Sequence, residues 1–67
     1  MEVVLKIREK RLELGLSQIQ LADKLSVGQS AVAMWENGAA YPRVEILIKL
    51  SEIFGCTLDE LVKGEER

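Results

Sequence analysis

The sequence predicts an all-α fold of five short helices. Apolar residues recur at spacings of three and four along the chain, and no segment has the sustained apolar–polar alternation that is typical of half-buried strands. Glycine, proline and capping residues also divide the 67 residues into short segments. With 48% apolar residues the chain can form a core, and we expect residues 1–67 to fold as one domain.

The five predicted helices have clear start and stop signals. Gly15, Gly38 and Gly55 are suited to the left-handed position that follows a helix. Pro42 lies in a connection, because proline is not tolerated inside a helix. The predicted helices cover about residues 3–14, 18–25, 29–37, 44–54 and 58–62.

Two of these helices begin with a capping-box pattern. Ser17 is followed three residues later by Gln20, and Thr57 is followed at the same spacing by Glu60. In a capping box the hydroxyl accepts from a backbone N–H of the first turn, and the longer side chain accepts from the cap residue's own N–H. We therefore expect the second helix to begin after Ser17 and the fifth to begin after Thr57.

The composition argues against an enzyme or a metal site. The chain has no histidine, and Cys56 alone can form neither an intramolecular disulfide nor a cysteine-based zinc site. No nucleophile–base pair or phosphate-binding loop is visible, so we expect no catalytic residue, no metal, no cofactor and no small-molecule ligand. The absence of paired cysteines, of a signal peptide and of a span of ~20 apolar residues predicts a cytoplasmic protein without membrane contact.

One stretch is unusually poor in charge. "GQSAVAMWENGAAYP", residues 28–42, contains one charged side chain, Glu36, in a chain that is 30% charged. On a helical wheel the predicted third helix turns Ala31, Val32 and Trp35 inward, whereas Gln29, Ser30, Ala33 and Asn37 point outward with Met34 on the flank. A small, uncharged outward face suits close approach to another surface, either the DNA major groove or a protein partner.

The order of motifs resembles the helix-turn-helix core of the Cro/cI-type (XRE) DNA-binding family. The segment "LSQIQLADKLSVGQSAVAMWENGAAYP" carries the resemblance, which extends over about residues 3–62. It implies a lambda-repressor-like domain whose third helix enters the major groove while the second lies across the DNA backbone. The implied function is a sequence-specific, double-stranded-DNA-binding transcriptional regulator, namely a repressor.

The resemblance also implies roles for individual residues. Those that would face base edges are Gln29, Ser30, Ala33 and Met34. Those that would touch phosphates are Ser17, Gln18, Asn37 and Arg43. Arg11 and Glu36 would form a structural pair between the first and third helices.

The chain departs from the family pattern at several positions. Ser26 stands in the inter-helix turn where members often have glycine, and a left-handed serine there costs on the order of 1 kcal/mol. Gly28 and Arg43 occupy cap positions where a hydroxyl residue is common. The net charge is −2, and the predicted third helix has no basic residue.

The predicted fourth helix has a second apolar stripe. Because a surface helix needs only one apolar face, we expect the second stripe to form a homodimer that binds a near-palindromic operator. The candidate interface residues are Ile46, Leu50, Ile53 and Val62. Alternatively, the fifth helix or the N-terminus covers this stripe within one chain.

A competing function stays open at this point. The helix-turn-helix can also serve a protein-interaction module, such as an antitoxin-like or regulatory partner, in which DNA binding is weak or secondary.

Overall fold

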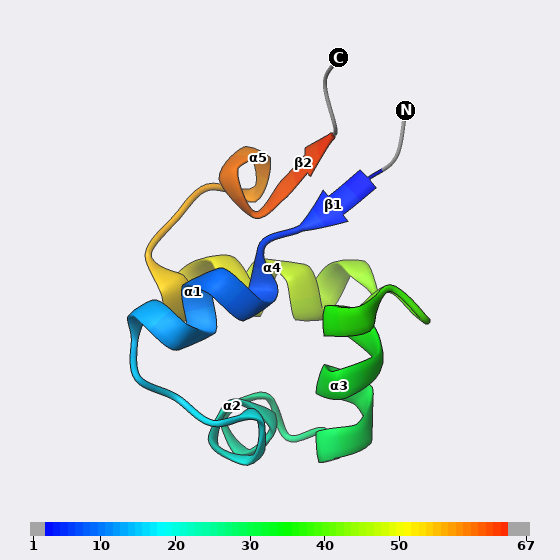
Figure 1. Ribbon diagram of the computed structural model, residues 1–67. Helices are drawn as coiled ribbons and strands as arrows, with labels where there is room; N and C mark the ends of the chain where they lie inside the picture. Colours follow the sequence, from blue (N-terminus) through cyan, green and yellow to red (C-terminus); the bar gives the residue numbers. More distant parts are fainter. Residues whose placement is uncertain (1–2, 65–67) are drawn as a thin grey trace.

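The computed structural model describes residues 3–64, which form five helices and a two-stranded antiparallel ribbon (Figure 1). The helices are α1 (Ile7–Glu13), α2 (Gln18–Leu25), α3 (Gln29–Asn37), α4 (Val44–Phe54) and α5 (Leu58–Leu61), and the strands are β1 (Val3–Leu5) and β2 (Val62–Gly64). The five-helix fold is confirmed. The last four predicted helices agree with the observed bounds to within one residue.

The first predicted helix began too early. Residues 3–5 form β1, in which Val3 lies opposite Gly64 and Leu5 lies opposite Val62, and α1 begins only at Ile7. The Lys6 backbone N–H continues the pairing by donating to the Leu61 carbonyl at 2.9 Å. Valine suits a strand when a partner is present, but here the partner lies at the opposite end of the described chain, where local periodicity gives no sign of it.

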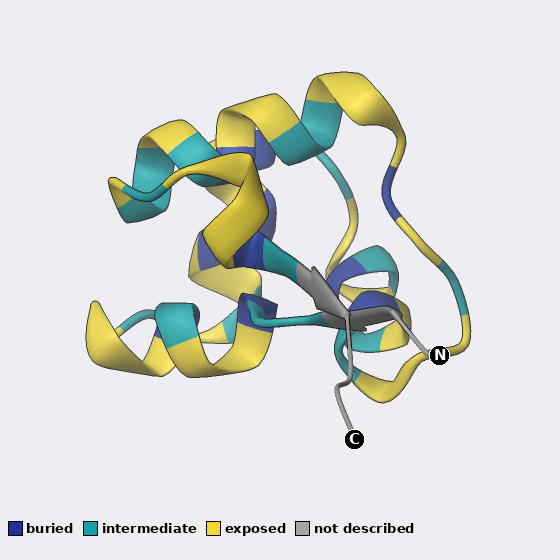
Figure 2. Cartoon of the chain, turned by 90° about the horizontal axis from the view of Figure 1, so that it is seen from above, coloured by how far each residue is buried: buried dark blue, intermediate teal, exposed yellow. Residues whose placement is uncertain are grey.

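Every helix contributes to one core. The residues that are buried and apolar are Ile7, Leu21, Ala22, Leu25, Val32, Trp35, Leu50 and Leu61. Figure 2 shows these buried segments between the helices, whereas the outer surfaces of the helices are exposed. In α3 the inward prediction is confirmed for Val32 and Trp35, so this helix is held from one side and presents its other side to solvent.

The second apolar stripe of α4 is used within the chain. Leu50 is 0% exposed, so its assignment to a dimer interface was wrong. Ile46, Ile53 and Val62 are half-buried and pack against the core. The physical reason is that α4 contacts α1, α2 and α5, so a wider band of its surface is covered than in a helix with one neighbour.

The capping signals placed the helix ends correctly. Both predicted capping boxes are present, at Ser17 with Gln20 and at Thr57 with Glu60. In the turn between α2 and α3, Ser26 is left-handed with φ 59° and ψ 41°, and it is the only non-glycine residue at positive φ among those described. The helix-turn-helix therefore has a strained residue at its turn.

Replacing Ser26 with glycine is expected to raise the free energy of unfolding by about 1 kcal/mol, because glycine adopts the left-handed conformation without steric cost. Urea unfolding measures the change. Ser51→Gly makes the same exchange in the helical backbone of α4, where a loss of about 0.5–1 kcal/mol is expected. A lower stability for Ser26→Gly would show that the serine hydroxyl matters more than the backbone strain.

Candidate nucleic-acid interface

The outward side of α3 carries the residues that the resemblance assigns to base contacts. Gln29, Ser30 and Met34 are exposed, and Ala33 is half-buried beside them. Val32 and Trp35 anchor the opposite side of the helix in the core. The helix thus presents an amide, a hydroxyl and two apolar groups, which are the side-chain types that hydrogen-bond base edges or contact thymine methyl groups.

The four residues assigned to phosphate contacts lie at helix ends. Ser17 is the N-cap of α2 and Gln18 is its first residue, Asn37 ends α3, and Arg43 is the N-cap of α4. Gln18 is half-buried and the other three are exposed. At the end of α3, Asn37 Oδ1 accepts from the Ala39 backbone N–H at 2.9 Å, which leaves the amide N–H groups of Asn37 available to donate to an acceptor such as a phosphate.

A shallow hollow connects Arg43 to the helix-turn-helix. Its volume is about 340 Å³, and its lining residues are Val27, Trp35, Tyr41, Pro42, Arg43 and Ile46. Val27 belongs to the turn between α2 and α3, so this turn and the N-cap of α4 line the same hollow. Arg43 therefore places a basic residue on the same hollow as Trp35 of α3, a helix that has no basic residue of its own.

Arg11 and Glu36 are in contact, in the arrangement that the resemblance implies. Arg11 Nε donates to Glu36 Oε2 at 2.6 Å, and Arg11 Nη2 donates to Glu36 Oε1 at 3.0 Å. Their side chains are 10% and 5% exposed, and Arg11 Nη1 also donates to the Leu16 carbonyl at 2.8 Å. The bidentate contact joins α3 to α1, and the hydrogen bond to Leu16 joins α1 to the connection before α2.

The pair also neutralises the one charged side chain of α3, because the carboxylate of Glu36 is matched by the guanidinium of Arg11. Burial by itself raises the pKa of Glu36, but hydrogen bonds from Arg11 and Gln18 and the nearby positive charges of Arg11 and Arg8 outweigh it, so the pKa lies below its ordinary value. The hydrogen bond with Glu36 likewise raises the pKa of Arg11 above its ordinary value, against the effect of burial. Glu36 is thus ionised at neutral pH, yet it is shielded and paired, so it does not repel phosphates.

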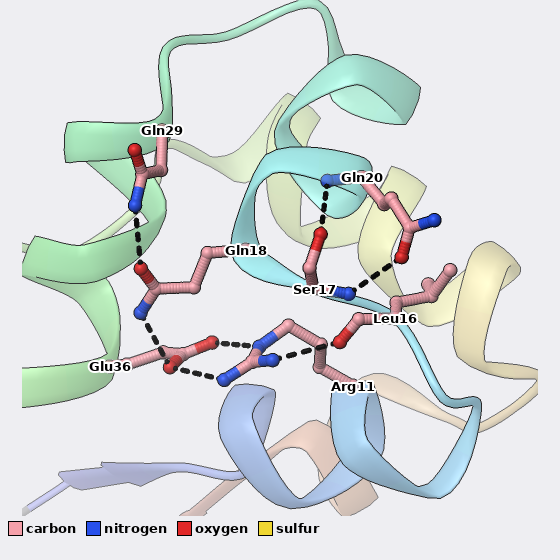
Figure 3. A network of polar contacts seen from close by, with 7 residues as sticks. All are labelled: Arg11, Leu16, Ser17, Gln18, Gln20, Gln29 and Glu36. Carbon is pink, nitrogen blue, oxygen red and sulfur yellow. Dashed lines mark hydrogen bonds and ion pairs between the residues drawn. The ribbon is translucent and has the colours of Figure 1, made fainter.

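Two further hydrogen bonds were not predicted from the sequence. Gln18 Nε2 donates to Glu36 Oε1 at 3.0 Å, and Gln29 Nε2 donates to Gln18 Oε1 at 3.1 Å (Figure 3). These side chains meet only because α2 packs against α3, which local patterns do not reveal. The available signal was that a glutamine occupies the first position of both helices.

The described residues include no membrane-spanning or metal-binding arrangement. Within residues 3–64, no helix has the length and hydropathy required to cross a bilayer. The same residues contain no group of three or more histidine, cysteine, aspartate or glutamate side chains that could hold a metal ion.

The chain is similar in sequence to known regulators of transcription. The chain is 42% identical over 66 residues to the HTH-type transcriptional activator BcrR of Enterococcus faecalis, covering 98% of this chain and 32% of that protein. It is 34% identical over 61 residues to the cryptic phage CTXphi transcriptional repressor RstR of Vibrio cholerae, covering 91% of this chain and 55% of that protein. The chain therefore spans about a third of the first relative and about half of the second.

The fold is also similar to a solved protein–DNA complex. The crystal structure of the P22 c2 repressor protein in complex with a synthetic operator superposes with a TM-score of 0.81 at 33% identity, covering 90% of this chain and 91% of that chain. A family model described as Helix-turn-helix matches residues 7–61, from the start of α1 to the end of α5. The chain therefore belongs to the helix-turn-helix family, as its resemblance to Cro/cI-type members indicated.

Proposed function

We propose that this chain is a sequence-specific regulator of transcription that binds double-stranded DNA and inserts α3 into the major groove. The observation that carries the proposal is the exposed, uncharged face of α3, on which Gln29 and Ser30 project from a helix anchored by Trp35 and by the Arg11–Glu36 pair. A glutamine amide can pair with both N6 and N7 of adenine. The operator complex of the similar P22 c2 repressor supports the same partner for this chain.

We propose repression as the regulatory outcome. RstR and P22 c2 are repressors by name, whereas BcrR is an activator by name. Repression requires only that a protein occupies DNA that the polymerase needs, and a domain of this size can do so by itself. Activation requires in addition a surface that contacts the transcription machinery, which makes repression the simpler proposal.

The test separates base reading from phosphate anchoring. Gln29→Ala is expected to lose about 1–3 kcal/mol of binding free energy on the cognate site and to relax the preference at one base pair per half-site. Arg43→Ala is expected to weaken binding to all duplexes alike and to lower the salt slope by about one per monomer. Asn37→Ala is expected to act equally on all sequences with little change in slope, because an amide releases no counterion.

The measurement is a salt titration of each variant on cognate and scrambled duplexes, the cognate site being selected from a random duplex library. Lys49→Ala removes the same charge as Arg43→Ala from an exposed site further along α4 and is expected to change the slope less. If Gln29→Ala weakens both duplexes equally, or if no duplex binds the wild type at low salt, base reading by α3 is refuted.

We further propose that the chain acts as a homodimer through the exposed apolar residues of the α3–α4 loop and α4. Tyr41, Val44 and Ile48 are 62%, 65% and 43% exposed, and Val44 and Ile48 lie one turn apart. We call these three residues the apolar surface. They take the place of the second apolar stripe of α4 as the candidate dimer interface, because that stripe packs against the core of its own chain. A two-fold dimer would present two α3 helices about 34–36 Å apart to successive major grooves of a near-palindromic site.

Sedimentation is expected to show a dimer at high micromolar concentration, and Ile48→Asp is expected to shift it to monomer without unfolding the chain, because the side chain lies outside the core. Glu52→Asp, at an exposed position one turn further along α4, is the control for a surface change. A wild type that stays monomeric with and without DNA rejects the homodimer. The apolar surface then favours a different protein partner, which is the second candidate function.

A further inference from the structure

The end of α3 carries the only asparagine of the chain, and a glycine follows it directly. Asn37 is the last residue of α3, and Gly38 is its left-handed C-cap with φ 84°. Both residues are exposed, and a Cβ built on Gly38 meets no non-neighbouring atom within 4 Å. We propose that Asn37–Gly38 is a self-modification site, at which the Gly38 backbone nitrogen displaces the side-chain amide of Asn37 and so converts the asparagine into an acidic residue.

The reaction needs no partner other than water and its hydroxide. The Gly38 nitrogen gives up its proton to hydroxide and forms a bond to Asn37 Cγ. The bond between Cγ and Nδ2 then breaks, and Nδ2 takes up a proton from water and leaves as ammonia, which closes a cyclic succinimide and regenerates the hydroxide. Water opens this ring at either carbonyl carbon, so the product is aspartate or its β-linked isomer, isoaspartate. The net change converts an amide and water into a carboxylic acid and ammonia, and nothing is oxidised or reduced.

A backbone donor is in place for the charge that develops in this reaction. When the Gly38 nitrogen attacks, negative charge collects on Asn37 Oδ1, and the Ala39 backbone N–H donates to this atom at 2.9 Å. A donor about 2.7–3.1 Å from a developing oxyanion stabilises the transition state. The same hydrogen bond spans Gly38, so the Asn37 side chain is folded back over the peptide that attacks it.

One hydrogen bond opposes the attack. The Gly38 N–H donates to the Met34 carbonyl, which also accepts from the Ala39 N–H at 2.9 Å. Opening of this last turn frees the Gly38 nitrogen and leaves the Ala39 N–H to Oδ1 alone, and helix ends open at little cost in free energy. The opening is confined to the residues after Glu36, because both oxygens of that carboxylate are held by Arg11 (Figure 3).

The modification reverses the chemistry of a proposed phosphate contact, and this consequence rests on the proposed function. The Asn37 amide can donate to a phosphate, whereas a carboxylate only accepts hydrogen bonds and repels the phosphate charge. In isoaspartate the main chain also gains a methylene group just before the loop that leads to Arg43. A phosphate that holds the Asn37 amide keeps the last turn closed. The regulator therefore loses activity with time when it is free and is preserved while it occupies its operator.

Mass spectrometry of the free chain tests the reaction itself. In mildly alkaline buffer the chain is expected to gain the mass difference between an amide and an acid, and the peptide that contains position 37 is expected to contain isoaspartate. Asn37→Gln is expected to lose this conversion, because its longer side chain has to close a larger ring. Gly38→Ala is expected to slow it, because a Cβ crowds the attacking nitrogen. Gly55→Ala makes the same exchange at the left-handed end of α4 and is expected to keep the wild-type rate. A wild type that converts no faster than Gly38→Ala overturns the proposal.

Binding measurements on the separated, converted chain test its consequence. The converted chain and Asn37→Asp are both expected to bind cognate and scrambled duplexes about 10- to 100-fold more weakly than the fresh chain, because a hydrogen bond to a charged group is lost. Duplex at about 100 times its Kd is expected to slow the conversion of the wild type by about 100-fold, because only the free fraction reacts. A converted chain that binds as tightly as the fresh one, or a complex that converts at the rate of the free chain, overturns the link to DNA binding. If no duplex binds the wild type, the proposed function fails, and the mass measurement alone decides whether Asn37–Gly38 is a modification site.

Discussion

Glu36→Ala is expected to lower the free energy of unfolding by about 3–5 kcal/mol, because removing one partner of a buried ion pair leaves the other charge without compensation. Arg11 is 8% exposed and would keep only the Leu16 carbonyl as a hydrogen-bond acceptor. Gln18 would lose its acceptor as well. Urea unfolding measures this loss. An exposed ion pair contributes only about 0–1 kcal/mol, so the expected loss is clearly larger than that for an exposed pair.

Two variants test whether burial of the ion pair is the reason for the large stability loss of Glu36→Ala. Glu52→Ala makes the same substitution at an exposed position of α4, where a change within about 0.5 kcal/mol is expected. Combining Glu36→Ala with Arg11→Met removes both charges and is expected to recover much of the loss, because no unpaired charge stays buried. A loss for Glu36→Ala as small as that for Glu52→Ala would mean that water reaches the pair and that it does not tie α3 to α1.

The pair also predicts how stability depends on pH. The pKa of Glu36 in the folded chain lies below its ordinary value of 4.5, which applies to the unfolded chain. The folded state therefore binds this proton less readily than the unfolded state, so the stabilisation is complete above 4.5 and is lost as the pH falls through the folded pKa. The hydrogen bond with Glu36 raises the pKa of Arg11 above its ordinary value, so the contribution of Arg11 is present at all lower pH and is lost only in strongly alkaline solution. The stability difference between wild type and Glu36→Gln is expected to shrink on acidification.

The helices were predictable because their signals are local. Ser17 and Thr57 each stand three residues before the side chain that completes the capping box, and both boxes formed. Gly38 and Gly55 adopt the left-handed conformation at the ends of α3 and α4. Each of these features depends on neighbours within one helical turn, so the sequence alone determines it.

The features that were missed depend on residues that are distant in sequence. β1 pairs with β2 across nearly the whole described chain, and no property of Val3 by itself indicates that partner. The Gln18–Gln29 hydrogen bond exists because α2 and α3 pack together, and the helical wheel of the third helix gives Gln29 only as an outward-facing residue. The sequence of α4 indicated two apolar stripes, and nothing local to that helix decides which of them the rest of the chain covers.

Leu50→Ala is expected to lower the free energy of unfolding by about 2–5 kcal/mol, the range for deleting a buried leucine side chain when the surrounding structure relaxes only in part. Leu50 is 0% exposed, so the loss is intrinsic to one chain and is expected to be the same at low and high protein concentration. Ile48→Ala, two residues earlier in α4 and 43% exposed, is the matched control: it is expected to cost little in one chain and, if the apolar surface joins two chains, to weaken their association. Urea unfolding over a hundredfold range of protein concentration separates the two cases, because stability derived from association rises with concentration whereas stability derived from a core does not. If the effect of Leu50→Ala grows with protein concentration, Leu50 lies between chains after all, and the core described for α4 is incorrect.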